Sequence, residues 1–156
     1  MTYRWWVFLH IAGALGFLAA HGVSVGVAFR VRREREPGRI MALLELSSSS
    51  VTLMYVSLLI LLTGGVVAGF LGQWWSRYWI WVSLGTLIAI MAAMYAFATL
   101  YYRRLRRIVG AMANGSQAVS GERLAEVLSG PRPWILAVIG FGGIVFILYL
   151  MIFKPF

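Results

Sequence analysis

The stretch WWVFLHIAGALGFLAAHGVSVGVAF, residues 5–29, decides the fold of this chain. It exceeds the roughly 20 apolar residues that a helix needs to cross a bilayer, and it holds both histidines of the sequence, His10 and His21. Their separation of 11 residues is about 20° more than three helical turns and about 16 Å along the helix axis. The two imidazoles are therefore predicted to lie on one stripe of a transmembrane helix.

The composition of the whole chain is that of a membrane protein. Of the 156 residues, 61% are hydrophobic and 12% are charged, whereas a soluble domain needs more charged side chains to cover its core. Arg4 alone precedes an apolar stretch longer than the roughly 7–15 residues of a signal peptide, so we expect residues 5–29 to be a retained span. Cysteine is absent, which excludes disulfides, cysteine-bound zinc, iron–sulfur clusters and thiol nucleophiles.

Four apolar runs are long enough to span the membrane, and together they predict one domain, residues 1–156. The predicted spans are residues 5–29, 49–71, 78–101 and 133–153. We therefore expect an all-α membrane protein, an up-down bundle of four transmembrane helices.

The connections between the spans are expected to contain helix boundaries and further helix. The hydroxyls of residues 47–50 are expected to cap the second span. The third helix is expected to continue beyond the membrane to Asn114 and Gly115, because apolar residues recur at helical spacing opposite four arginines. A short amphipathic helix is expected at residues 121–128. Both segments are predicted to pack at the membrane interface.

Basic residues are distributed unequally between the two ends of the spans. The connections at residues 30–48 and 102–132 carry all but three of the 14 basic residues, and Arg4, Arg77 and Lys154 lie at the other end. By the positive-inside rule both basic connections are cytoplasmic, so the N- and C-termini lie outside the inner (plasma) membrane of a bacterial cell. We expect these connections to contact anionic lipid headgroups, and we do not expect nucleic-acid binding.

Tryptophans and glycines mark predicted contacts of the helices. Tryptophans near the outer ends of the spans are expected to anchor the protein in the membrane interface. They are Trp5, Trp6, Trp74, Trp75, Trp79 and Trp81. Glycines let helix backbones approach closely, which predicts helix contacts, or an interface in a homo- or hetero-oligomer. The glycine faces are Gly22-x-x-x-Gly26, Gly65-x-x-x-Gly69, and Gly140, Gly142 and Gly143.

The spans lack the residues of several common membrane activities. No aspartate, glutamate, lysine or arginine lies inside a predicted span. Proton-coupled transporters and pumps normally bind their ion with such a residue, so this class is not expected. Phosphate-binding loops, nucleophile elbows and zinc-protease motifs are also missing from the sequence. The candidate functional residues are therefore the two histidines.

Histidines inside a helical bundle are typical of membrane b-type cytochromes, in which an imidazole holds the haem iron. The leading hypothesis is a haem b-binding redox protein or electron-transfer subunit, with His10 and His21 as axial ligands. The second span runs opposite to the first and brings Met54 and Tyr55 to the level of His21, and Met91 and Met94 of the third span lie at a comparable depth. His21 can therefore pair with Met54 or Met91 as a further ligand. Because one helix supplies one imidazole per level, the second ligand must come from a methionine, a tyrosine or a second copy of the chain.

Other interpretations of the histidines stay open. Each ring can form a structural hydrogen bond with a carbonyl or hydroxyl of a neighbouring helix, and Thr86 and Tyr149 lie at the level of His10. Copper(I) is a reasonable metal for His10 and His21, since imidazole and thioether ligands both suit it. The chain can also be a non-catalytic accessory subunit of a larger membrane complex. The sequence leaves open whether the protein is an enzyme.

The first half of the chain also resembles a known family. The segments FLHIAGA, residues 8–14, and LAAHG, residues 18–22, are similar to the first helix of small four-span bacterial membrane proteins of unknown function. Those proteins are distantly similar to the membrane domain of copper-resistance D proteins. The arginine-rich first connection, and the Trp-Trp and Tyr-Tyr-Arg-Arg sequences around the third span, extend the likeness over roughly the first 110 residues. The resemblance implies a four-helix bundle and haem or copper handling, with His10 and His21 as ligands.

Overall fold

The protein is a bundle of four long helices. The computed structural model describes residues 2–113 and 121–155. The long helices are α1 (Thr2–Val31), α2 (Pro37–Leu71), α3 (Tyr78–Ala113) and α5 (Arg132–Phe153), with the 3-10 turn η1 (Trp74–Ser76) and the short helix α4 (Gly121–Ser129) between them. The described chain contains four segments that are long and apolar enough to cross a membrane. The prediction of an all-α, four-helix membrane fold is confirmed.

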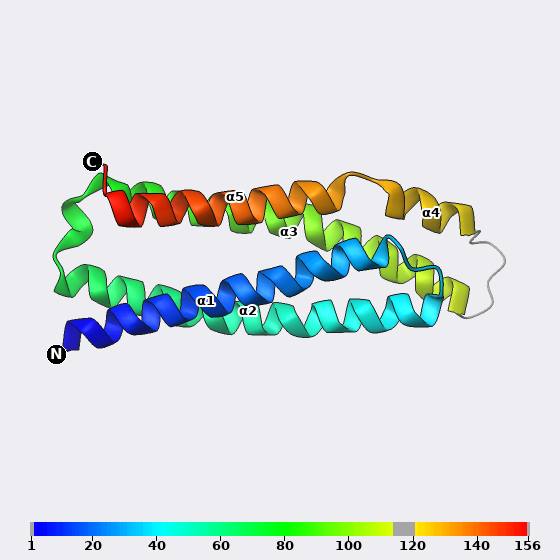
Figure 1. Ribbon diagram of the computed structural model, residues 1–156, viewed down its shortest axis with the longest axis horizontal. Helices are drawn as coiled ribbons and strands as arrows, with labels where there is room; N and C mark the ends of the chain where they lie inside the picture. The colour runs from blue at the N-terminus through cyan, green and yellow to red at the C-terminus, as the bar shows by residue number, and fades with distance from the viewer. Residues whose placement is uncertain (1, 114–120, 156) are drawn as a thin grey trace.

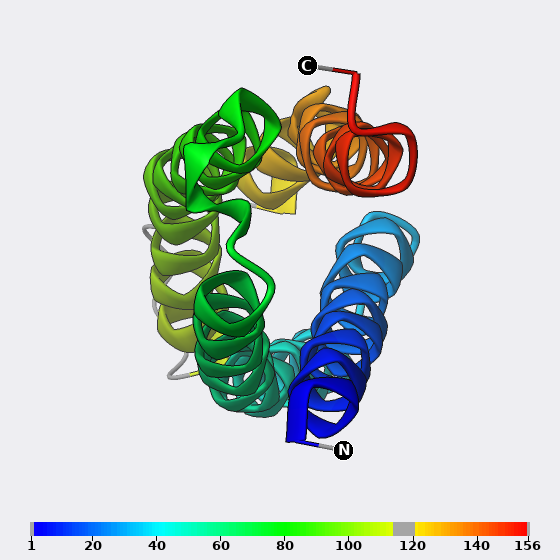
Figure 2. The ribbon, with the colours of Figure 1, turned by 90° about the vertical axis from the view of Figure 1, so that its left-hand side faces the viewer.

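The helices run up and down around a central space. Figure 1 shows α1 beside α2, and α3 beside α5, with both termini and η1 at one end of the molecule. Figure 2, viewed from that end, shows the four long helices arranged in a ring. We call this end the aromatic end, because it carries Trp74, Trp75 and Trp79. The opposite end, which carries α4 and the turn between α1 and α2, is called the basic end.

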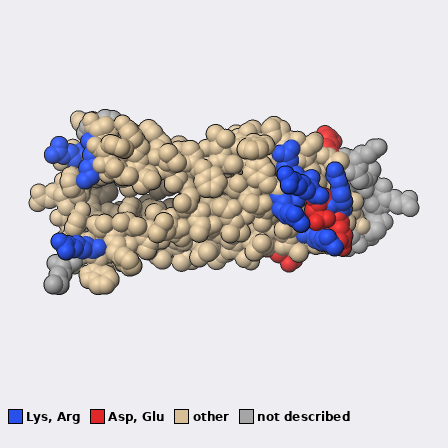
Figure 3. Space-filling model, viewed as in Figure 1, with Lys and Arg blue, Asp and Glu red and all other residues tan. Residues whose placement is uncertain are grey.

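The outer surface between the two ends is uncharged. Figure 3 shows lysine, arginine and glutamate only at the ends of the molecule, with most of the arginines at the basic end. Large apolar side chains such as Leu53, Leu59 and Val138 are exposed on the surface between them. Exposed apolar side chains on every long helix suit a bilayer rather than water.

The start of α2 differs from the prediction. The helix begins at Pro37 rather than at Ser49, because proline is well suited to the first turn of a helix. Most of the segment predicted as the first connection is therefore helical. Residues 47–50 lie inside the helix and cap nothing, so the predicted cap is wrong. Instead, Ser47 and Ser50 are buried, and the Ser50 hydroxyl lies 2.8 Å from the Ser24 hydroxyl of α1.

Two other helical segments outside the predicted spans lie where the sequence predicts them. Helix α3 continues to Ala113, as its apolar spacing predicts, while Asn114 and Gly115 lie outside the described residues. Helix α4 occupies Gly121–Ser129, where residues 121–128 were expected to be helical.

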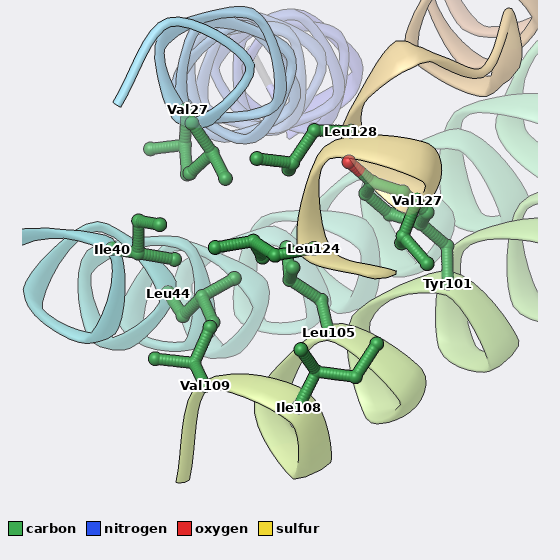
Figure 4. Packing of buried hydrophobic residues seen from close by; sticks show 11 residues of the cluster. Val27, Ile40, Leu44, Tyr101, Leu105, Ile108, Val109, Leu124, Val127 and Leu128 are labelled. Atoms are coloured by element: carbon green, nitrogen blue, oxygen red, sulfur yellow. The ribbon is translucent and has the colours of Figure 1, made fainter. Parts of the chain in front are cut away.

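Helix α4 closes the basic end with a compact apolar cluster. Figure 4 shows its side chains packed between those of α1, α2 and α3. The buried members are Val27, Val31, Ile40, Leu44, Tyr101, Leu105, Ile108, Val109, Leu124, Val127 and Leu128. Two arginines reinforce this end, since Arg32 donates a hydrogen bond to the Ser129 carbonyl at 3.2 Å and Arg106 donates one to the Leu44 carbonyl at 3.1 Å.

Glycines allow the backbones of α1 and α2 to touch. A Cβ atom at Gly13 would lie 2.5 Å from the backbone nitrogen of Leu61, and one at Gly64 would lie 2.6 Å from the backbone nitrogen of His10. By contrast, nothing lies within 4 Å of the Cβ position at Gly22 or Gly26. The predicted contact face on α1 therefore meets no neighbour among residues 2–113 and 121–155, and a role for it in oligomers stays a prediction.

We predict that Gly13→Ala destabilises the protein by about 1–3 kcal/mol, the usual cost of overpacking a tight contact. The added methyl group would force α1 away from the backbone of α2 near Leu61. Thermal unfolding of the purified protein in detergent measures the effect as a lower midpoint. Gly26→Ala is the matched control on the same helix and should leave the midpoint unchanged. Equal midpoints for the two variants would contradict this account of the α1–α2 contact.

Candidate functional site

The two histidines lie on the inner side of α1 but border different cavities. His10 lines a large cavity near the aromatic end, and His21 lines a small cavity deeper in the bundle. They share one helix, as predicted, but the structure does not bring them together at one site.

The large cavity, here called the aromatic-end cavity, has a volume of about 480 Å³. All four long helices and η1 contribute to its wall, which is mostly aliphatic and aromatic, and Figure 3 shows the surface hollowed near this end. Its polar lining includes His10, Ser83, Trp75 and Lys154. An apolar cavity of this size with a few polar groups is the usual form of a small-molecule site.

The aromatic-end cavity opens sideways between α1 and α5. Figures 1 and 2 show these two helices separating toward the aromatic end. Leu15 of α1 and Leu148 of α5 line the cavity and are also 63% and 54% exposed. Because this surface belongs to the apolar zone of the bundle, a ligand can reach the cavity from the bilayer.

A hydrogen bond to α2 fixes the His10 ring. The His10 Nδ1 atom lies 2.8 Å from the Leu61 carbonyl oxygen. A carbonyl can only accept, so Nδ1 carries the proton and donates it, which leaves the lone pair of Nε2 free in the neutral ring. Gly65 makes room for the ring, because a Cβ atom there would lie 2.7 Å from Nδ1. This is the arrangement that orients metal-binding histidines in many proteins.

The side chains predicted beside His10 are not its partners. Thr86 donates its hydroxyl hydrogen bond to the Val82 carbonyl of its own helix at 2.8 Å. Tyr149 is exposed on the surface. His10 does form the bond to a carbonyl of a neighbouring helix that the structural interpretation predicts.

Two further polar groups border the aromatic-end cavity. The Lys154 ammonium nitrogen lies 4.3 Å from the centroid of the Trp74 ring, a cation–π contact. The Trp75 indole nitrogen is buried and has no hydrogen-bond partner among the described residues. A buried donor without an acceptor is rare in folded proteins, so this indole N–H is a candidate for contact with a ligand. The sequence interpretation of Trp75 as a membrane anchor did not identify this candidate contact.

His21 lies in a closed apolar environment. Its side chain is 2% exposed, and its Nε2 atom has no hydrogen-bond partner within the described parts of the chain. The ring packs edge-on against Phe141, with centroids 5.1 Å apart, and Nε2 lies against the Cα of Gly140, where a Cβ atom would collide with it. The Nε2 atom of His21 therefore does not form the predicted bond to a carbonyl or hydroxyl of the described helices.

The small cavity beside His21 brings the predicted methionines to that ring. It has a volume of about 20 Å³, and Met54 of α2 and Met91 and Met94 of α3 line it together with His21. A volume of this size holds about one water molecule or one ion. This space is much smaller than a porphyrin.

Other kinds of metal site find no support in the described residues. Among residues 2–113 and 121–155, no group of three or more histidine, cysteine, aspartate or glutamate side chains could hold a metal ion. Such groups are the usual ligands of zinc and of hard divalent cations. The metal ligands that the described residues provide are therefore an imidazole with thioethers at His21, and a single imidazole in an apolar cavity at His10.

Comparison with known families places the whole bundle in one of them. Residues 5–155 match the family described as "Predicted integral membrane protein (DUF2269)". The chain belongs to this family. The match covers all four long helices, so this DUF2269 protein is a multi-pass membrane protein, in agreement with the predicted membrane family of unknown function. No curated protein and no solved structure matches the chain, and similarity to copper-resistance D proteins is not shown.

We predict that Gly140→Ala destabilises this DUF2269 protein by about 1–3 kcal/mol, because the methyl group collides with the His21 ring. Gly142→Ala is the matched control on α5, since nothing lies within 4 Å of the Cβ position there. Thermal unfolding in detergent should separate the two variants. A Gly140→Ala midpoint equal to that of Gly142→Ala would mean that His21 does not pack on α5.

Proposed function

We propose that this protein is an integral membrane haem b-binding redox protein, with the haem in the aromatic-end cavity and His10 as an axial ligand. The observation that carries the proposal is the orientation of His10. The His10 Nδ1–H donates a hydrogen bond to the Leu61 carbonyl oxygen, with 2.8 Å between the nitrogen and the oxygen. This bond leaves Nε2 as a lone-pair donor on the wall of a cavity of about 480 Å³. An oriented, neutral imidazole of this kind suits iron ligation.

The size and the lining of the cavity support a large flat apolar ligand. Ligand sites commonly measure about 300–1,000 Å³, and this one has walls of aliphatic and aromatic side chains with Ala14 and Gly65 as its small members. The opening past Leu15 and Leu148 offers entry from the bilayer, where an apolar macrocycle concentrates.

Polar groups at the aromatic end suit the two carboxylates of haem. Lys154 supplies a positive charge at the rim of the cavity, and the Trp75 indole N–H is a buried donor for which the described residues offer no acceptor. A carboxylate accepts strong hydrogen bonds from both kinds of donor. These residues would orient the ligand with its acidic edge toward the membrane surface.

A methionine is available as a second axial ligand. Met151 of α5 lines the same cavity as His10, and histidine–methionine ligation raises the potential of a haem iron. His21, Met54 and Met91 border the separate small cavity, so we do not assign them to the haem. When bound, the haem would supply one-electron chemistry, and His10 and Met151 would hold its iron.

We predict that the protein expressed with ample haem shows a Soret band and reduced b-type absorption bands, and that His10→Ala abolishes them by removing the iron ligand. His21→Ala is the matched control on the same helix and should keep the bands. Met151→Leu should convert the spectrum from six- to five-coordinate, and Lys154→Glu should weaken haem binding about tenfold, or about 1.4 kcal/mol.

Absence of a Soret band after haem saturation, or an unchanged spectrum in His10→Ala, would refute the haem proposal. Native mass spectrometry of the same preparation identifies any other occupant. A retained anionic lipid that is lost on Lys154→Glu would assign the cavity to a lipid in place of haem.

A second candidate is a non-catalytic accessory subunit of a larger membrane complex. It is favoured by Gly22 and Gly26, whose Cβ positions meet nothing within 4 Å, so another helix can approach α1 closely there. This function predicts no cofactor, and the haem spectrum therefore separates it from the first proposal.

We also propose that the protein lies in the bacterial inner membrane with both termini outside and the basic end in the cytoplasm. The unequal distribution of arginines supports this orientation, and the basic end offers exposed arginines to anionic lipid headgroups.

The orientation predicts opposite labelling of two single-cysteine variants, which the cysteine-free sequence makes unambiguous. A membrane-impermeant maleimide added to intact spheroplasts should label Lys154→Cys, at the aromatic end, without lysis. It should label Arg35→Cys, in the exposed turn before α2, only after lysis. The reverse result would place the basic end outside.

A further inference from the structure

We infer that His21, Met54, Met91 and Met94 form a binding site for one soft monovalent metal ion, such as copper(I), in the interior of the bundle. The site is separate from the aromatic-end cavity, and the inference does not depend on haem binding there.

The first support is the condition of His21. Its ring is 2% exposed, and its Nε2 atom finds no hydrogen-bond partner among the described residues. Leaving a buried polar atom without a hydrogen bond destabilises the folded protein. An imidazole kept in this state inside a membrane span indicates a ligand that the nitrogen can bind.

The second support is that methionine side chains from two other helices line the same cavity as His21. Met54 on α2 and Met91 and Met94 on α3 line the same cavity as His21 on α1. Met91 and Met94 are three positions apart on one helix, so their side chains leave the same face of α3. Three helices thus bring one imidazole and three thioethers around a single small space.

The volume of this space limits the ligand to one atom or one small molecule. At about 20 Å³, the cavity holds one water molecule at most. A buried water needs two to four polar partners, and here the imidazole is the one strong partner because thioether sulfur is a weak acceptor. A soft metal ion would instead bind the methionine sulfur atoms as ligands, and it would also give the His21 Nε2 atom the partner that it lacks.

The donor set selects the kind of ion. Thioethers and imidazole are soft to borderline ligands that favour copper(I), whereas calcium and magnesium require oxygen ligands. The residues lining this cavity include no carboxylate, so the site would not neutralise a second positive charge in an apolar surrounding. A monovalent ion is therefore preferred over a divalent one. Silver(I), which shares this chemistry, is a convenient redox-inert probe.

The inference is tested by anaerobic titration of the purified full-length protein with copper(I) against a competing chromogenic copper(I) chelator. One equivalent should bind, and X-ray absorption should show nitrogen and sulfur neighbours of the metal. His21→Leu, and the triple change Met54→Leu, Met91→Leu and Met94→Leu, should each lower the affinity at least tenfold. Methionine-to-leucine changes conserve volume, and thermal unfolding checks that each variant folds.

Met151→Leu and His10→Leu are the matched controls, because both residues line the aromatic-end cavity and not the small one. Both should bind copper(I) with unchanged affinity. No stoichiometric binding, or binding unaffected by His21→Leu and by the triple change, would overturn the inference. Loss of binding in the controls alone would overturn it too, since the ion would then lie in the aromatic-end cavity. The haem proposal is judged separately from the Soret band, which the small-cavity variants should retain.

Discussion

The close approach of α1 to α2 is the contact on which the internal arrangement of this protein depends. Gly13 and Gly64 let the two backbones touch, and this contact sets the position of α1 relative to the rest of the bundle. Once α1 is in place, His10 meets the Leu61 carbonyl, and His21 comes to face the methionines of α2 and α3. A larger side chain at either glycine would move both imidazoles at once. In a membrane, where apolar surfaces gain little by leaving lipid, such close packing is a main source of helix association.

The two ends of the bundle are built differently. At the basic end, α4 inserts Leu124 and Leu128 between the long helices, and the resulting cluster is almost entirely buried. At the aromatic end no comparable cluster separates the helices among the described residues, and the space between them forms the large cavity. The same helices therefore make a rigid closure at one end and a ligand-sized space at the other. This difference between the two ends agrees with the general rule that a binding site is supported by rigid structure next to it.

The sequence predicts the fold well because each determinant of a membrane helix is local. Span length and apolar composition are sufficient to identify four helices, and the amphipathic pattern after Tyr101 identifies the extension of α3 and the helix α4. The start of α2 at Pro37 was not predicted, because Arg39, Glu45 and the serines at residues 47–50 indicated a connection and a helix cap. Depth along the predicted spans placed Met54, Met91 and Met94 at the level of His21. The division of the histidines between two cavities, and the inward indole of Trp75, depend on helix rotation and tilt. Those are set by contacts such as Gly64 with the backbone at His10, which a single sequence does not reveal.

The gap between α1 and α5 makes the entrance of the large cavity sensitive to the thickness of the bilayer. The cluster at the basic end holds α1 and α2 to α3 and α4. A change in the tilt of α1 and α2 would therefore move their other ends, at the aromatic end, the most. A helix of 30 residues is about 45 Å long, and tilting it by about 5° moves its far end by about 4 Å. Helices respond to a thinner or thicker membrane by tilting. A tilt of this size would change the width of the entrance between α1 and α5.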